Sequence, residues 1–180
     1  MLKLEIAEIV QLINESKHFE AECIDSSFYL KIDEYTPFVC FAIHNGHNLR
    51  NDIKQNCLLT EHERWQEEDP ETYNFISSLP IVISANDSRY EYDLNRNENS
   101  AIYDEAWGKK VWKEPLTEKQ RKTSLQKHQN FYKVVHTLIQ KLEAKFKAVV
   151  VYDVHSYNYK RYENCTPVFN LGTERIDREK

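Results

Sequence analysis

The chain has 180 residues, of which 41% are hydrophobic and 29% are charged, and its net charge is −5. This composition is typical of a soluble globular domain, and the negative charge gives no reason to expect nucleic acid or an anionic membrane as a partner. No apolar run approaches the roughly 20 residues that span a bilayer, and the N-terminus lacks a signal-peptide pattern. The four cysteines are scattered without a CxxC spacing, which favours reduced thiols and a cytoplasmic location.

The N-terminal part of the chain predicts a helix, a hairpin and a buried strand. Apolar residues recur at helical spacing from Leu2 to Ile13, so residues 3–16 are expected to form an amphipathic helix. Residues 18–25 and 27–35 have strand character around an Asp-Ser-Ser turn and predict a hairpin. The continuous apolar run PFVCFAIH is typical of a central strand that is covered on both faces.

The middle of the chain predicts two short helices and another strand. Thr60 and Glu63 have the spacing of a capping box, which predicts a helix that begins there. Pro70 is favoured in a first helical turn and predicts the start of the second helix. The apolar segment IVISAN predicts a buried strand over residues 81–86, and the weak periodicity of residues 97–114 predicts a loop.

The C-terminal part predicts a long helix followed by a third apolar strand. Thr117 is expected to cap a helix over about residues 118–146, and AVVVYDVHS predicts a strand over residues 148–156. One face of this helix is expected to lie mainly in the core, and it carries His128, Phe131, Tyr132 and His136. Strands separated by helices predict an α/β fold with a mostly parallel sheet, and residues 1–180 are expected to form one α/β hydrolase-like domain.

Polar side chains follow each of the three apolar strands. His44 and His47 come after the first strand, and Asp153, His155 and Ser156 lie at the end of the third. The segment Asp-Leu-Asn-Arg over residues 93–96 follows the second. Because ligands in open α/β sheets bind outside the carboxyl ends of the strands, we expect these groups to converge.

Three of these residues are histidines, which suggests a zinc site. A catalytic zinc takes three protein ligands and keeps one position for water, and His44, His47 and His155 supply such a set. Gly46 allows a tight turn between the first two, and Asp153 is placed to orient an imidazole as an outer carboxylate. The alternative is that these histidines are ordinary polar residues of surface loops or helix caps. Their shared position at strand ends favours the metal site.

Arg96 is a candidate for binding the carboxylate of a substrate. Its planar guanidinium can hold both carboxylate oxygens, and Asn95 can add a directional hydrogen bond. Asp93 is expected to hold Arg96 in place. The alternative is a surface ion pair, the commoner fate of an Asp/Arg pair, and Arg89 is a second and weaker candidate for the anion.

The ordered segments AIHNGH, EEDPET, SRYEYDLNR, KHQNFY and VYDVHS resemble the N-formylglutamate amidohydrolase family over about residues 36–173. The resemblance implies a phosphorylase/hydrolase-like, zinc carboxypeptidase-like fold with a mixed, mostly parallel sheet flanked by helices. Relatives hold zinc with an HxxE pair and a later histidine, and bind a carboxylate with an Asn-Arg dipeptide. By motif, His44 and His47 match the pair, His155 matches the later histidine, and residues 95–96 match the dipeptide.

The sequence departs from the family pattern at two places. The second ligand position carries His47 instead of glutamate, and Glu67 or Glu68 is the alternative carboxylate, although both are expected on a solvated helix face. The relatives activate water with a glutamate well after the last histidine, and here the candidates are Glu163 and, by preference, Glu174. So few residues follow His155 that we expect either a truncated fragment or a short homologue.

Together these residues predict a Zn²⁺-dependent amidohydrolase that cleaves the amide of a small N-acyl acidic amino acid. The family resemblance implies N-formylglutamate as the substrate, with Arg96 and Asn95 holding it and Glu174 moving the proton. One alternative is a metal- and carboxylate-binding module of the same fold that has lost its general base. Another is a scaffold whose aromatic loop, with Trp107 and Trp112, contacts a partner.

Overall fold

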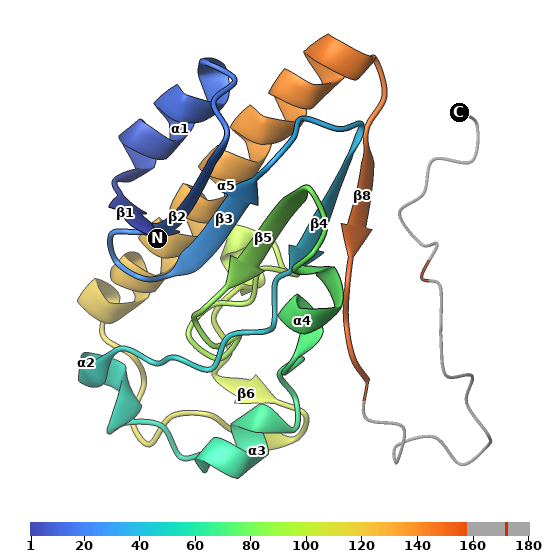
Figure 1. Cartoon of the computed structure of the whole chain (residues 1–180). Helices are drawn as coiled ribbons and strands as arrows, with labels where there is room; N and C mark the ends of the chain where they lie inside the picture. Colours follow the sequence, from blue (N-terminus) through green and yellow to red (C-terminus); the bar gives the residue numbers. More distant parts are fainter. Residues whose placement is uncertain (158–171, 173–180) are drawn as a thin grey trace, which may run out of the picture.

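The computed structural model describes residues 1–157 and Gly172, and a mixed sheet flanked by helices forms its centre (Figure 1). The strands of this sheet are β1 (Leu2–Leu4), β2 (Phe19–Cys23), β3 (Phe28–Ile32), β4 (Phe38–Ala42), β5 (Ile81–Ala85) and β8 (Val150–Asp153). Their order across the sheet is β1-β2-β3-β5-β4-β8. β4 runs parallel to β5 and β8, and β1 runs parallel to β2, whereas β3 is antiparallel to both neighbours. The predicted α/β fold with a mostly parallel sheet is confirmed.

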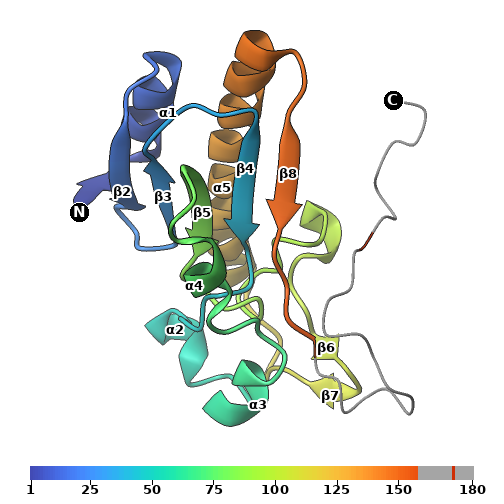
Figure 2. The same cartoon turned by 45° about the vertical axis from the view of Figure 1, so that its right-hand side comes forward.

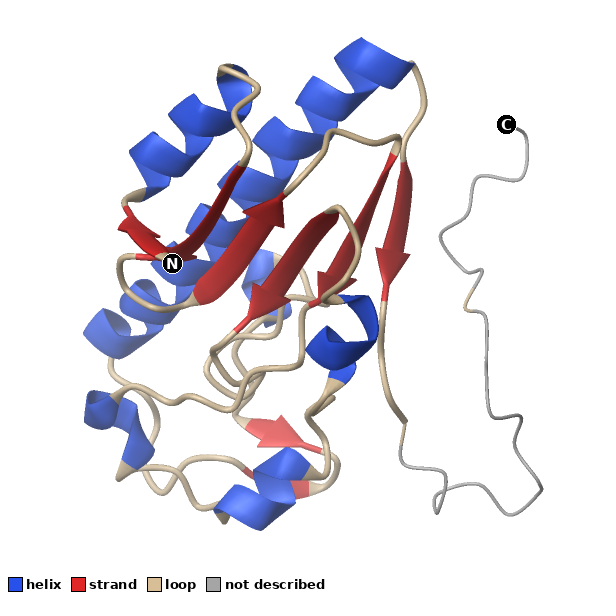
Figure 3. Cartoon of the chain, viewed as in Figure 1, coloured by secondary structure: helices blue, strands red, loops and turns tan. Residues whose placement is uncertain are grey.

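Helices cover both faces of the central strands, which explains why those strands have continuous apolar sequences. On one face α1 (Ile6–Asn14) packs against α5 (Glu118–Phe146), and on the other face α4 (Thr72–Ile76) contacts β4 (Figure 3). Side chains of β4 alternate between the two layers. Val39 and Phe41 join the core beneath α1 and α5, whereas Cys40 and Ala42 pack with Ile76 of α4.

The long helix α5 begins where its capping sequence predicts. Thr117 Oγ1 accepts a hydrogen bond from the Gln120 N–H at 3.3 Å, and Gln120 Oε1 accepts one from the Thr117 N–H at 2.9 Å. Leu138 and Leu142 are fully buried, and such a side chain contributes about 1.5–3 kcal/mol to stability. His128 and Phe131 lie on the buried face, as predicted, whereas Tyr132 and His136, which were expected on the same face, are exposed. The helix therefore provides a firmly anchored layer behind the strands.

Two segments adopt structure that the sequence patterns did not predict. Residues 2–4 form β1 instead of the first turn of α1, because their backbone pairs with β2 and the capping box of Glu5 and Glu8 starts the helix only afterwards. The expected loop over residues 97–114 contains a 3-10 turn and a hairpin. These are η1 (Glu98–Ser100), β6 (Glu105–Ala106) and β7 (Lys109–Lys110).

Further differences concern the elements next to the carboxyl ends of the strands. Short helices α2 (Asn51–Lys54) and α3 (Glu61–Trp65) follow β4, and Thr60 caps α3 as predicted. α4 begins at Thr72 rather than at Pro70, because Glu71 between them has a φ of 67°, which a right-handed helix does not contain. β8 ends at Asp153, so the last residues of the expected strand extend beyond the sheet.

The carboxyl ends of β4, β5 and β8 point to the same edge of the molecule (Figure 2). α2, α3 and the hairpin of β6 and β7 lie beyond this edge. Loops from distant parts of the sequence therefore meet at the carboxyl edge of the sheet, which is where open α/β sheets usually bind their ligands.

Candidate metal centre

Two histidines and an aspartate meet at the carboxyl edge of the sheet. Ligand atoms of His44, Asp69 and His155 all lie within 4.8 Å of one another. Asp69 Oδ2 lies 3.2 Å from His44 Nδ1 and 2.8 Å from His155 Nδ1, and the two imidazole centroids are 5.0 Å apart. His44 and Asp69 are buried, whereas the His155 side chain is one-third exposed. The cluster is therefore enclosed around His44 and Asp69 and reaches solvent at His155.

Each imidazole of this cluster has a second carboxylate at its other nitrogen. His44 Nε2 lies 2.7 Å from Asp93 Oδ1, and His155 Nε2 lies 3.0 Å from Asp153 Oδ2. Histidines that bind metals usually donate their remaining N–H to a carboxylate, which fixes the tautomer and leaves the other nitrogen for the ion. Two such nitrogens and one carboxylate are a donor set that suits a catalytic zinc. The residues present therefore fit a metal ion. Asp153 contacts the nitrogen of His155 that faces away from Asp69, which is the position that an orienting carboxylate needs.

The charge state of the carboxylates also suits a cation. Burial raises the pKa of Asp69, but hydrogen bonds with His155 and His44 outweigh burial and hold the pKa well below its usual range. The same balance, with His44 and Arg89 as the stabilising partners, lowers the pKa of Asp93. Burial lowers the pKa of His155, but hydrogen bonds with Asp153 and Asp69 raise it overall to about 10. Without a metal, a proton on His155 thus balances the carboxylates around it.

Backbone and side-chain contacts hold Asp69 beside His44. The Asp69 N–H donates to the His44 carbonyl oxygen at 2.9 Å, and the Ser156 hydroxyl donates to Asp69 Oδ1 at 3.0 Å. The Thr72 hydroxyl donates to the Asp69 carbonyl oxygen at 2.7 Å, at the start of α4. Segments after β4, before α4 and after β8 are therefore tied together at this single residue.

Gly46 serves a different purpose from the one predicted. A Cβ at this position would overlap the backbone carbonyl groups of Asn86 and Asp87. The loop after β4 thus needs glycine because it crosses the loop after β5 at close range, and not because of a left-handed turn. Asn48 pairs with Asp87 in an isolated parallel bridge at the same crossing.

His47 lies outside the cluster and takes part in a neighbouring network. Its Nδ1 is hydrogen-bonded to Glu68, and its Nε2 lies 3.2 Å from Arg64 Nη2. Glu68 is buried, not on a solvated helix face as expected, and it also accepts a hydrogen bond from Ser88. The carboxylate beside His44 and His155 is instead that of Asp69, the next residue. Because this segment is an irregular bend, sequence periodicity gave no indication of which of its acids points inwards.

Asn95 and Arg96 are exposed beside the cluster. The Asn95 N–H donates to Asp93 Oδ1 at 2.7 Å, and the side chain of Arg96 hydrogen-bonds with Tyr103. Asp93 was expected to pair with Arg96, but the two side chains do not pair. Asp93 Oδ2 instead accepts hydrogen bonds from Arg89 Nε at 3.1 Å and from Arg89 Nη2 at 2.7 Å. Arg89 is thereby neutralised and is not a free anion binder. Arg96 remains on the surface.

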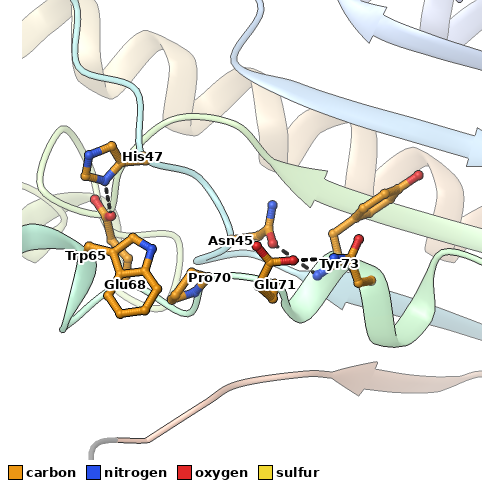
Figure 4. Close-up of a pocket in the computed structure, with 8 residues that line it drawn as sticks. Asn45, His47, Trp65, Glu68, Pro70, Glu71 and Tyr73 are labelled. Atoms are coloured by element: carbon orange, nitrogen blue, oxygen red, sulfur yellow. Dashed lines mark hydrogen bonds and ion pairs between the residues drawn. The ribbon is translucent and has the colours of Figure 1, made fainter.

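A cavity of about 250 Å³ lies between the loop after β4 and the segment around α3 and α4 (Figure 4). It is lined by Asn45, His47, Trp65, Glu68, Pro70, Glu71, Tyr73 and Asn74. Asn45 and Pro70 are the chain neighbours of His44 and Asp69, so the cavity follows the same two segments. Asn45 Oδ1 accepts a hydrogen bond from the Tyr73 N–H at 3.1 Å and thereby fixes the start of α4 to the loop after β4. The proposed bases Glu163 and Glu174 lie outside the described residues.

The fold and the cluster define an α/β protein with a candidate metal centre at the carboxyl edge of its sheet. A sequence model of the N-formylglutamate amidohydrolase family matches residues 36–179, and the chain belongs to this family. The predicted resemblance to that family is confirmed.

One solved structure supports the same placement of the fold. The chain is similar to the crystal structure of N-formylglutamate amidohydrolase from Ralstonia eutropha JMP134, with a TM-score of 0.67 and 16% sequence identity. The match covers 78% of this chain and 62% of that chain. No curated protein sequence matches the chain. No helix among residues 1–157 is long and apolar enough to cross a membrane.

Proposed function

We propose that the chain is a zinc-dependent amidohydrolase with a zinc carboxypeptidase-like fold, and that its substrate is an N-acyl acidic amino acid such as N-formylglutamate. The observation that carries this proposal is the cluster of His44, Asp69 and His155, in which each imidazole has an outer carboxylate. Asp69 replaces His47 in the proposed ligand set, because His47 is bonded to Glu68 and Arg64. Family membership supports an amide as the bond that is cleaved.

The ligand atoms are His44 Nδ1, Asp69 Oδ2 and His155 Nδ1, which already face one another. A bound zinc ion would polarise the scissile carbonyl and lower the pKa of a coordinated water towards about 7. Asp93 and Asp153 keep both imidazoles oriented through their Nε2 atoms, and Ser156 holds the second oxygen of Asp69. These contacts fix the ligands before a substrate arrives, so little reorganisation accompanies binding.

Arg96 is the proposed binder of the substrate carboxylate, with Asn95 beside it. The side chain of Arg96 reaches Tyr103, and Tyr103 is hydrogen-bonded to Asp93, which contacts His44. An exposed guanidinium at this position can take a carboxylate with two hydrogen bonds and orient the amide towards the cluster. Glu174 is the proposed general base.

A second candidate function is a module that binds metal and carboxylate without turnover. The observation in its favour is that Asp69, Asp93 and Asp153 are each bonded to a histidine within residues 1–157. None of these three carboxylates is therefore free to take a proton from water. On this view the site binds the ligand but lacks the general base.

Elemental analysis, zinc titration and turnover of N-formylglutamate test the proposal together. One zinc per chain with release of formate and glutamate supports the hydrolase, and zinc binding without release supports the binding module. Asp69→Asn should abolish zinc binding, whereas the matched variant His47→Ala should retain it. Loss of zinc in His47→Ala with retention in Asp69→Asn would contradict the ligand set, and absence of zinc binding in the parent chain would overturn the function.

A further inference from the structure

The hairpin of β6 and β7 turns through an unusual pair of residues. Trp107 and Gly108 form its two-residue turn, with φ values of 52° and 74°. Such turns require two positive φ values and are normally built from Asn-Gly or Gly-Gly. A bulky aromatic residue rarely adopts a left-handed conformation, and it persists only where the surroundings hold it. Trp107 is thus kept at a position that disfavours it.

The ring of Trp107 packs over residues that surround Asp93. Arg89 Cζ lies 4.9 Å from the ring centroid, within the range of a cation–π interaction. The Trp107 ring also meets the rings of Tyr103 and Tyr90 edge to face, with centroids 5.7 Å and 5.9 Å away. The Arg89 side chain is only 11% exposed, whereas Trp107 is 43% exposed, so the Trp107 ring covers the guanidinium from the solvent side.

The contacts of Asp93 connect this stack with the candidate metal centre. Its Oδ2 accepts hydrogen bonds from Arg89 and Tyr103, both of which pack against Trp107. Its Oδ1 faces His44 Nε2 at 2.7 Å. The direction of the carboxylate, and with it the imidazole of His44, therefore depends on how Arg89 and Tyr103 are held.

We propose that Trp107 is a positioning residue, which fixes Arg89 and Tyr103 on Asp93 and thereby orients His44 towards the metal. The strained turn is retained because only this conformation places the ring over Arg89. The effect on the metal rests on the proposed function, whereas the effect on Arg89 does not. No residue of the hairpin needs to touch the metal or the substrate.

Two substitutions of Trp107 distinguish the effect of its ring from the effect of the strained turn. Trp107→Gly removes the ring and relieves the turn, so thermal stability should be kept while zinc affinity falls about tenfold, the lower end for loss of an outer contact. Trp107→Phe keeps a ring over Arg89 and should restore most of the affinity, although the turn stays strained. Phe75→Ala, which removes an exposed aromatic ring outside both the cavity lining and the cluster, should leave zinc affinity unchanged.

A second readout needs no metal. The Arg89 Nε–H donates to Asp93 at 3.1 Å, and its NMR signal can be assigned by its loss in Arg89→Lys. In the metal-free protein this proton should exchange with water at least several-fold faster in Trp107→Gly than in Trp107→Phe or the parent chain. A parent chain that binds no zinc would refute the proposed function, yet the exchange rates would still decide the role of Trp107. Unchanged exchange in Trp107→Gly, or equal losses of zinc affinity in both variants, would overturn the inference.

Discussion

Zinc binding at the cluster should displace one proton from His155. The pKa of this imidazole is raised to about 10 by hydrogen bonds to Asp153 and Asp69, so at pH 7 the metal-free side chain carries two protons on its ring. Zinc needs the unprotonated Nδ1, and the affinity should therefore rise about tenfold per pH unit between roughly pH 6.5 and the raised pKa. Because the side chain is one-third exposed, solvent screening reduces the upward shift of the pKa and lowers the upper limit of this pH range. The zinc affinity should still rise with pH.

Calorimetry measures this proton directly. Titrations at one pH in buffers of different ionisation enthalpy give the number of protons released, which should be close to one at pH 7. Asp153→Asn removes the carboxylate at Nε2, so it should release fewer protons and flatten the pH dependence of zinc affinity. Binding of one zinc by the parent chain with no proton release would refute the assignment of His155 as a charged partner that becomes a ligand.

Three substitutions test the rest of the site. Arg96→Ala should raise the KM for an N-acyl amino acid about 10- to 100-fold, because one charge-assisted contact is lost. Its zinc affinity, measured by chelator competition, should stay unchanged. Equal losses of substrate affinity and zinc affinity would indicate a structural role. Asp93→Asn should lower zinc affinity about 10- to 100-fold and, because it leaves Arg89 buried without its carboxylate, should lower the free energy of unfolding in urea by about 3–5 kcal/mol. Gly46→Ala should reduce that free energy by about 1–3 kcal/mol because a Cβ overlaps the backbone at Asn86. Unchanged unfolding of Gly46→Ala would contradict the close crossing of the two loops.

Patterns that report burial predicted the fold well. The apolar runs of β4 and β5 identified the central strands, because strands covered on both faces are mainly apolar. The apolar run of β8 also identified a strand, but within the described residues β8 lies at the edge of the sheet and its side chains are exposed. The cap at Thr117 identified the start of α5, since its hydrogen bonds form within a few residues. β1 and the hairpin of β6 and β7 were missed, because such short strands are decided by tertiary pairing and carry no periodicity of their own.

The site was predicted less completely, because its contacts join segments that sequence spacing does not relate. His44 and His155 lie together because parallel strands end at the same edge, which is a general rule of such sheets. Asp69 was missed because it lies in a bend where three acids follow one another and only the fold selects one. Asp93 pairs with Arg89 and not with Arg96. The sequence contained a signal for this pair, because Arg89 precedes Asp93 by four residues.

Buried ion pairs around the cluster serve geometry more than stability. Arg64 pairs with Glu68, Arg89 with Asp93, Lys127 with Asp87 and Arg50 with Glu91, and each acid is at most 6% exposed at its side chain. Desolvation offsets most of the attraction in such pairs, so apolar replacements of both partners often keep or raise stability. Three of the pairs nevertheless tie a loop at the carboxyl edge to a helix or to another loop, and the fourth directs the carboxylate that holds His44. The apolar core beneath α5 can therefore hold the fold while these pairs determine where the ligands of the candidate metal point.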